Sequence, residues 1–227
     1  MDRKQAIGSA YHLTGGNNFY DGMITCSTLS GKSVCRLVWD MNKAENDAYQ
    51  EKALSGIPEN FSGNLLEVPV GTGILTMPLY QTLPEADITC LDYSADMMGR
   101  AQEKANRLNL NNVTFQQGDV GALPFTDVAF DIVLSLNGFH AFPDKEAAYR
   151  EVFRVLKPGG IFCGCFYVKG EQKRTDWFVR NVYEKTGFFT PPYETTVSLK
   201  KRLGKLYAAV TLGTVKSMAW FVCRKAE

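Results

Sequence analysis

The chain has 227 residues, of which 45% are hydrophobic and 22% charged, and its formal net charge is +1. This composition favours a packed domain and excludes global disorder, and the balanced charge argues against tight nucleic-acid binding, so a small-molecule ligand fits better. No run approaches the roughly 20 apolar residues of a membrane helix, and Met1–Gln5 leads into no apolar signal region, so we expect a soluble, cytoplasmic protein without membrane insertion.

Residues 1–60 are predicted to form a helical N-terminal cap or lid, with one helix over Ala44–Leu54. From residue 61 to 227, strand-like and helix-like runs alternate as one further structural unit. The strand-like runs are Asn64–Val68, Ile88–Leu91, Val113–Gln116, Phe130–Leu134, Gly160–Val168, Tyr207–Val215 and Ser217–Arg224. The helix-like runs are Ile74–Gln81, Ala95–Leu108, Lys145–Leu156, Asp176–Thr186 and the amphipathic Thr196–Tyr207. Ser94 and Asp144 are typical N-cap residues, and Pro158-Gly159-Gly160 is expected to stop the helix that Asp144 starts.

This alternation predicts an α/β, Rossmann-like fold with a mostly parallel sheet and helices on both faces. The last two strand-like runs are separated by almost nothing, so they form a tight hairpin. We therefore expect one antiparallel strand near the C-terminal end of the sheet.

The six cysteines contain no C-x-x-C pair, and four of them lie in apolar, strand-like runs. We expect buried, reduced thiols, with metal ligation or disulfides as the alternatives and no metal centre.

The stretch Asn64–Gly73 carries the main functional signal. An apolar run ends in Glu67, a turn with Gly71 and Gly73 follows, and the next apolar run ends in Asp92. The glycines let the backbone turn sharply and approach a ligand, and the second acid lies where it accepts hydrogen bonds from ribose hydroxyls. The pattern predicts a nucleoside-binding βαβ unit.

Four motifs in order make the chain resemble the class I S-adenosylmethionine (SAM)-dependent methyltransferases over about Asn64–Gly170. They are the acidic glycine loop Glu67–Gly73, the segment Leu91–Met98, the segment Gln117–Val120 with Leu123-Pro124-Phe125, and the segment Phe130–Asn137 with Arg154–Gly160 downstream. The resemblance implies SAM as cofactor and a seven-stranded sheet with a reversed seventh strand. It also implies a set of cofactor-binding residues: Glu67, Gly71, Thr72, Gly73, Asp92, Tyr93, Met97, Asp119, Val120 and Asn137. Purely structural roles remain open as alternatives for three of them: core packing for Tyr93 and Met97, and capping of a turn for Asp119.

NAD is the rival cofactor, because its loop and second acid are similar. The dinucleotide fingerprint requires a third glycine or alanine, where this chain has Thr76. A carboxylate at Glu67 also suits the amino group of SAM better than a pyrophosphate. One departure from the resemblance is Pro69, which stands where the family usually has glycine and which removes an N–H.

The chemistry expected is methyl transfer to a small-molecule acceptor, which requires alignment of the reacting groups and exclusion of water. The catalytic residue is unknown from sequence; the weak candidates are His140, as a general base or substrate-side residue, and Tyr20, at the methyl end of the cofactor. The segment around Tyr20 resembles the entry segment of quinone-biosynthesis methyltransferases. A SAM-binding protein without catalysis is the alternative within the same family, and the acceptor atom and oligomeric state stay open.

Overall fold

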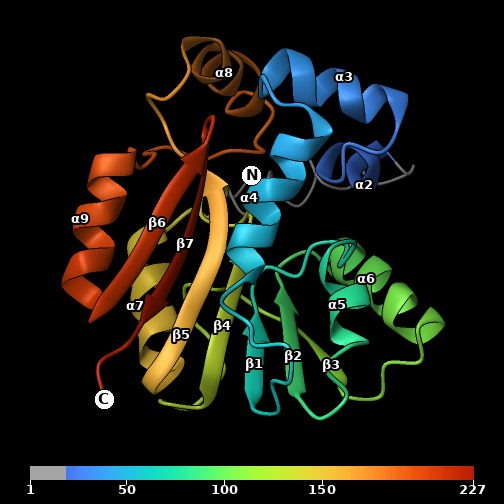
Figure 1. Ribbon diagram of the computed structural model, residues 1–227, viewed down its shortest axis with the longest axis vertical. Helices are drawn as coiled ribbons and strands as arrows, with labels where there is room; N and C mark the ends of the chain where they lie inside the picture. The colour runs from blue at the N-terminus through green and yellow to red at the C-terminus, as the bar shows by residue number, and fades with distance from the viewer. Residues whose placement is uncertain (1–18) are drawn as a thin grey trace.

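A computed structural model of the chain describes residues 19–227 (Figure 1). Its centre is a seven-stranded sheet with the strand order β3-β2-β1-β4-β5-β7-β6. The strands are β1 (Asn64–Glu67), β2 (Asp87–Asp92), β3 (Val113–Gln117), β4 (Phe130–Leu136), β5 (Leu156–Tyr167), β6 (Ala209–Val215) and β7 (Met218–Arg224). β7 is antiparallel to both of its neighbours, and the other four pairings are parallel. The predicted mostly parallel sheet with one reversed strand is confirmed.

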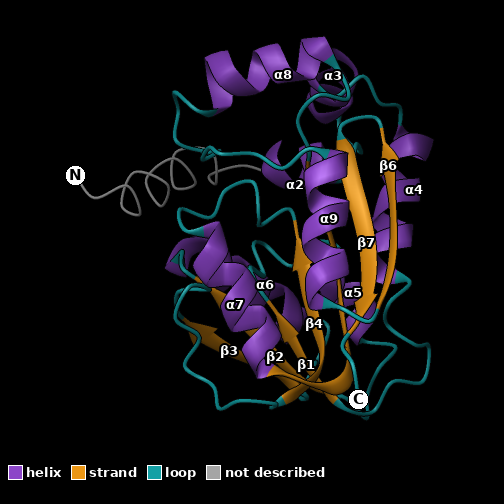
Figure 2. Cartoon of the chain, turned by 90° about the vertical axis from the view of Figure 1, so that its left-hand side faces the viewer, coloured by secondary structure: helices purple, strands orange, loops and turns teal. Residues whose placement is uncertain are grey.

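Helices cover both faces of this sheet (Figure 2). They are α2 (Phe19–Ile24), α3 (Leu29–Val38), α4 (Lys43–Leu54), α5 (Thr76–Tyr80), α6 (Ala95–Arg107), α7 (Lys145–Val155), α8 (Lys173–Phe178), which continues as the π-helical turn η1 (Val179–Tyr183), and α9 (Thr196–Leu206). Residues of α4, α5 and α6 share one hydrophobic core with the sheet, and residues of α7 and α9 share a second core on the opposite face. The result is a three-layer α/β/α arrangement.

The central strands are apolar at nearly every position because both of their faces are buried. In β1, Leu65 belongs to the core under α4–α6 and Leu66 to the core under α7 and α9, and both are fully buried. Burial of each such side chain contributes about 1.5–3 kcal/mol to folding. The two predicted N-caps are confirmed, since Ser94 accepts a hydrogen bond from the amide of Met97 and Asp144 from that of Ala147.

Three boundaries differ from the sequence-based expectation. The helix predicted over 176–186 begins at Lys173 instead, and Asp176 lies in its first turn, where its carboxylate accepts hydrogen bonds from the Tyr167 hydroxyl (2.6 Å) and the Gly170 amide (3.1 Å). Helix α7 ends at Val155, and β5 begins at the next residue, ahead of the predicted stop at 158–160. The helix expected over 74–81 is reduced to the five residues of α5.

Three elements gather beyond the carboxyl ends of the parallel strands, namely α2, α3 and α8 (Figures 1 and 2). The hydroxyl of Thr175 in α8 donates to the carbonyl of Val38 at the end of α3 (2.7 Å), and Arg174 pairs with Asp40 (2.6 Å). These contacts join two segments more than a hundred residues apart in sequence. The N-terminal helices are therefore held over the edge of the sheet where ligands of open α/β folds bind.

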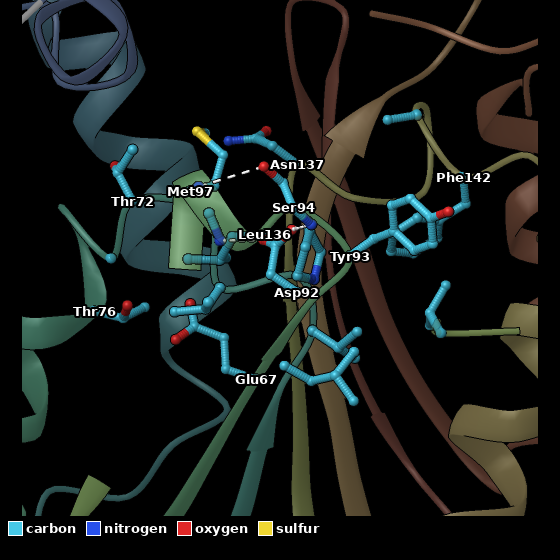
Figure 3. A pocket seen from close by; sticks show the side chains of 18 of the residues that line it. Glu67, Thr72, Thr76, Asp92, Tyr93, Ser94, Met97, Leu136, Asn137 and Phe142 are labelled. Atoms are coloured by element: carbon cyan, nitrogen blue, oxygen red, sulfur yellow. Dashed lines mark hydrogen bonds between the residues drawn. The ribbon is translucent and has the colours of Figure 1, made fainter. Parts of the chain in front are cut away.

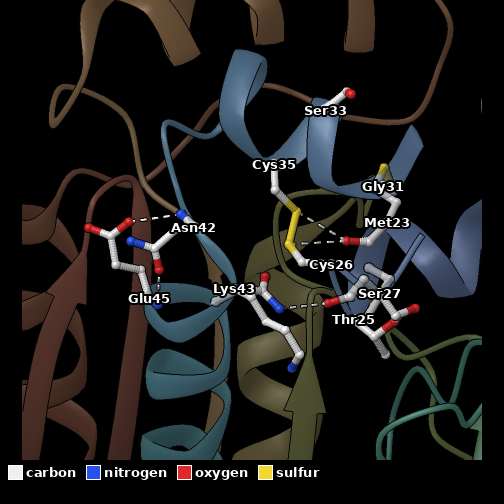
Figure 4. The surroundings of a disulfide bond; sticks show 12 residues. Met23, Thr25, Cys26, Ser27, Gly31, Ser33, Cys35, Asn42, Lys43 and Glu45 are labelled. Carbon is white, nitrogen blue, oxygen red and sulfur yellow. Dashed lines mark hydrogen bonds between the residues drawn. A yellow bond between two sulfur atoms is a disulfide. The ribbon is translucent and has the colours of Figure 1, made fainter. Parts of the chain in front are cut away.

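The cysteines follow the prediction only in part. Cys90, Cys163, Cys165 and Cys223 are free and buried in the sheet, as expected. Cys26 and Cys35 form a disulfide that joins the segment after α2 to α3 (Figure 4), so the expectation of reduced thiols was wrong for this pair. Thr28 caps the start of α3 between the two cysteines, and their Cα atoms lie 6.4 Å apart.

Across residues 19–227, no helix is long and apolar enough to cross a membrane. In the same residues, no three or more histidine, cysteine or acidic side chains cluster in a way that suits a metal ion. Met1–Gln5 and the second histidine, His12, lie outside the described residues.

Candidate active site

The carboxyl ends of β1, β2 and β4 form the floor of a cavity, which we call the strand-end cavity (Figure 3). It lies at the switch point of the sheet, where β1 pairs with β2 on one side and with β4 on the other. All ten residues predicted to bind a cofactor line its wall: Glu67, Gly71, Thr72, Gly73, Asp92, Tyr93, Met97, Asp119, Val120 and Asn137. The structure brings them together, and their individual roles stay predictions.

The glycine loop needs its two glycines for different reasons. Both have positive φ, +56° at Gly71 and +65° at Gly73, which favours glycine. At Gly71 a Cβ would meet no atom within 4 Å, so this backbone is open to the cavity. At Gly73 a Cβ would lie 2.8 Å from the Met77 side chain, so this glycine lets α5 pack against the loop.

Pro69 enters the same loop through a cis peptide bond and lines the strand-end cavity. A Cβ on Gly138 would lie 2.4 Å from the Pro69 ring, so the two residues pack in direct contact. The neighbouring amides are used within the fold, since Val70 donates to the Leu91 carbonyl (3.0 Å) and Gly71 to the Asp92 carboxylate (2.8 Å). The loop is thereby fixed to the end of β2.

Asp92 stands at the end of β2 with both carboxylate oxygens turned toward backbone amides. One oxygen accepts from Gly71 and the other from Ser94, each at 2.8 Å. Burial raises the pKa of Asp92 to about 6, and the two amide hydrogen bonds oppose that rise. Each carboxylate oxygen has a further lone pair, so Asp92 retains the capacity to accept hydrogen bonds from a diol.

Glu67 at the end of β1 is only 1% exposed. Its carboxyl accepts hydrogen bonds from the Tyr80 hydroxyl (2.9 Å) and the Cys90 thiol (3.7 Å). Burial raises the pKa of Glu67 to about 8, and no cation is among the groups that act on it. At neutral pH this carboxyl is therefore mostly protonated, and a cationic ligand beside it would favour its ionised form.

Residues of the second and third predicted motifs form another part of the wall. Met97 is buried and Tyr93 is exposed at the rim. Asp119 accepts a hydrogen bond from the amide of Gly121 (2.9 Å), so it caps the turn after β3. This contact is the structural alternative considered for Asp119.

Helix α2 closes the strand-end cavity from above. The Thr72 hydroxyl donates to one carboxylate oxygen of Asp21 (2.5 Å), and Lys104 of α6 pairs with the other (2.9 Å). Tyr20 and Ile24, on the same helix, line the cavity. Asp21 thus ties the N-terminal helix to the glycine loop, a role that no motif in the sequence predicted.

A second cavity of about 250 Å³ adjoins the first and shares Tyr20, Ile24 and Asn137 with it. We call it the aromatic cavity, because its wall contains the rings of Trp39, Tyr49, His140, Tyr183, Phe188 and Phe189. Several of these rings stack, with centroid distances of 5.9 Å for Trp39–Tyr183, 5.0 Å for Tyr183–Phe189 and 3.9 Å for His140–Phe189. Among the described residues, its lining contains no charged side chain.

Asn137 stands at the junction of the two cavities. It follows β4 directly, has a φ of +55°, and donates its amide hydrogen to the Cys165 carbonyl (2.7 Å). The weak catalytic candidates lie beside it: Tyr20 faces both cavities and His140 faces the aromatic one. Sequence reasoning did not assemble the remaining aromatic residues into one site, because they come from the end of α3, from α4, from η1 and from the loop after it, and only the tertiary fold brings them together.

The fold and the strand-end cavity together define a class of protein. Residues 65–160 match the model of a protein family described as "Methyltransferase domain". The chain therefore contains a class I, SAM-dependent methyltransferase domain, as the resemblance of its motifs implied.

Particular relatives are distant. The chain is 37% identical over 112 residues to the demethylmenaquinone methyltransferase of Thermus thermophilus, which is 49% of this chain and 50% of that protein. It is 32% identical over 117 residues to the enzyme of the same name from Lactococcus lactis, which is 51% of this chain and 46% of that protein. The aligned region thus spans about half the length of these curated relatives.

Solved structures share the fold. A methyltransferase from Haloferax volcanii, described in complex with the Trm112 methyltransferase activator, has a TM-score of 0.65 at 17% identity over 92% of this chain and 96% of that one. A phosphoethanolamine N-methyltransferase from Haemonchus contortus, in complex with S-adenosylhomocysteine, has a TM-score of 0.67 at 14% identity over 92% of this chain and 61% of that one.

Proposed function

We propose that this chain is a SAM-dependent methyltransferase that transfers a methyl group to a small-molecule acceptor and releases S-adenosylhomocysteine. The observation that carries the proposal is the pair of adjoining cavities. One is walled by the residues of the SAM-binding motifs, and the other is apolar, with Asn137 and Tyr20 at the junction.

The residues of the strand-end cavity fit SAM. Asp92 would accept hydrogen bonds from the ribose hydroxyls, and Glu67 would pair with the amino group, whose positive charge would ionise this carboxyl. Met97 and Tyr93 would pack on the adenine ring, and Asp119 would accept from its amino group. The open backbone at Gly71 lets the cofactor approach the loop. Thr72, Gly73 and Val120 would complete the contacts.

When bound, SAM supplies an activated methyl group on a sulfonium. The chain contributes alignment and the exclusion of water, which suffice for much of the acceleration of such a displacement. Helix α2 covers the junction of the cavities, and Asp21 holds it there through Thr72 and Lys104. We include in the proposal that residues 1–60 act as a cap on a domain of residues 61–227.

The acceptor class in this proposal is small and apolar, without nucleic acid. The curated relatives are named for a quinone, demethylmenaquinone, and the aromatic cavity suits a flat acceptor of that general kind. A cytoplasmic location is also part of the proposal. Reduced thiols at Cys26 and Cys35 in the purified protein would support this location, and a persistent disulfide would oppose it.

Calorimetric titration with S-adenosylhomocysteine, with NAD as the control ligand, tests the cofactor. We expect saturable binding of the first only. Asp92→Asn should weaken binding by roughly tenfold to a hundredfold, because it removes a charged hydrogen-bond acceptor. Asp87→Asn, at the exposed opposite end of β2, should leave binding unchanged.

Saturable binding of NAD, or no binding of S-adenosylhomocysteine, would refute the cofactor assignment. A screen with SAM labelled in the methyl group then separates an enzyme from a binding protein. Transfer of label to an apolar aromatic acceptor supports catalysis, and cofactor binding without any transfer favours the non-catalytic alternative.

A further inference from the structure

The His140 ring is held in one orientation. It is 6% exposed and stacks on Phe189 with 3.9 Å between ring centroids. Its Nδ1 accepts a hydrogen bond from the backbone amide of Tyr167 at 3.1 Å. This amide lies beyond the end of β4, which stops at Leu136 opposite Cys165, so it has no partner on that neighbouring strand.

This contact fixes the position of the imidazole proton. A backbone N–H can only donate, so Nδ1 must carry a lone pair, and in the neutral ring the proton then resides on Nε2. Protonation of Nδ1 would place two hydrogens face to face and leave a buried amide without an acceptor. His140 is therefore an Nε2–H donor by geometry.

Nε2 has no hydrogen-bond partner among the described residues. The ring lines the aromatic cavity, whose described lining offers no charged group and whose other walls are mostly hydrocarbon and aromatic. The partner of this donor therefore has to come from a cavity, and of the two described cavities that His140 lines, the aromatic cavity is the one with room for a ligand.

We infer that His140 is an acceptor-binding residue whose Nε2–H donates a hydrogen bond to an oxygen atom of the methyl acceptor. The inference rests on the proposed function, since it takes the aromatic cavity as the acceptor site. It further assigns the acceptor to compounds with a carbonyl, enolate or phenolate oxygen at that position, and it excludes a protonated amine there, which cannot accept a hydrogen bond.

The surroundings of the ring agree with a neutral histidine. Burial lowers the pKa of His140 to about 3, and the nearby positive charge of Lys145 acts in the same direction. The ionisable groups that line the two cavities beside it are Lys145 and Tyr149 of α7, Tyr49 of α4, Tyr20 of α2, and Tyr167, Tyr183, Tyr193 and Glu194 on the remaining sides. Burial raises the pKa of Tyr49, Tyr167 and Tyr183, so these three hydroxyls stay neutral across the physiological range.

The first test is the tautomer itself. In a His12→Gln variant His140 is the single histidine of the chain, and long-range ¹H–¹⁵N spectra of its ring report which nitrogen carries the proton. We expect the Nε2–H form without titration between pH 5 and 8. An Nδ1–H form, or a titration midpoint near 6 to 7, would overturn the inference and favour the hypothesis that His140 is a general base.

The second test uses two bicyclic probes of the same skeleton, 1-tetralone with a carbonyl oxygen and 1-aminotetralin with an ammonium group, each titrated in the presence of S-adenosylhomocysteine. We expect the ketone to bind and the ammonium compound to bind at least roughly tenfold more weakly. Absence of ketone binding, or a preference for the amine, counts against the inference.

Two variants separate the donor from the structural contact. His140→Asn keeps an amide oxygen near the Tyr167 amide and removes the distal donor, whereas His140→Gln extends an amide N–H toward the cavity. Asn should lower ketone affinity by roughly tenfold and Gln should restore most of it, with S-adenosylhomocysteine binding unchanged in both. Equal ketone binding by the wild type and both variants would overturn the inference. Absence of S-adenosylhomocysteine binding by the wild type would instead refute the proposed function.

Discussion

Replacing Glu67 by glutamine tests the electrostatics of the strand-end cavity. Because the pKa of Glu67 rises from 4.5 to about 8 on folding, the folded protein keeps a proton there at pH values where the unfolded chain has lost it. The stability of the wild type therefore falls as the pH rises through this range. Glutamine offers the Tyr80 hydroxyl an acceptor oxygen and does not ionise, so Glu67→Gln should be more stable by a margin that grows with pH.

The size of this margin follows from the two pKa values. It amounts to about 3 kcal/mol at pH 7 and to less than about 1 kcal/mol at pH 5. For a chain of this length, a gain of that size at pH 7 raises the melting temperature by roughly 6 to 12 °C. At the same pH the variant should bind S-adenosylhomocysteine more weakly, since the amino group of the ligand loses its carboxylate partner.

Thermal and denaturant unfolding at pH 5, 7 and 8.5 without cofactor measures the margin. Glu85→Gln, at an exposed position in the turn before β2, serves as the matched control. Its difference in stability from the wild type should be the same at all three pH values. A margin that is constant with pH, or a Glu67→Gln protein that is less stable than the wild type at pH 8.5, would refute the reasoning.

Two further perturbations address the loop and the N-terminal helices. Gly71→Ala should lose about 1–2 kcal/mol of stability, because φ at this position is +56°, and most S-adenosylhomocysteine binding, because the added methyl group would enter the cavity. Gly99→Ala, on α6 with free space around it, is the control. In the same denaturation and titration assays it should leave binding unchanged and be neutral or stabilising. Reduction of the Cys26–Cys35 disulfide should lower the free energy of unfolding of the wild type by about 2–3 kcal/mol, because the bond closes a loop between residues nine positions apart. A variant with serine at both positions should not respond to the reductant, and equal effects on the two proteins would contradict the prediction.

The part of the fold governed by local pattern was predictable. Leu65 and Leu66 sit in different cores, which makes β1 a continuous apolar run, and Ser94 caps α6 through a contact only three residues away. The antiparallel end of the sheet was also readable, because the two last strands are joined by only Lys216 and Ser217.

The acceptor side of the site was not predictable, since its physics is tertiary. Trp39 precedes Tyr183 and Phe189 by more than a hundred residues in the sequence, and each of the three taken alone is an ordinary aromatic residue. The contact that orients His140 likewise depends on the amide of Tyr167, which lies beyond the end of β4. The disulfide was missed because nothing in the spacing of Cys26 and Cys35 distinguishes a bonded pair from two buried thiols.

The shared walls of the two cavities have a consequence for how the two ligands affect each other's binding. Tyr20 and Ile24 border both cavities, and their helix is fastened to the glycine loop through Asp21. A cofactor that settles the loop also settles this helix, and with it one side of the acceptor cavity. The two binding free energies are then coupled, and linkage requires the coupling to be reciprocal. Each ligand is then expected to bind more tightly when the other is already in place.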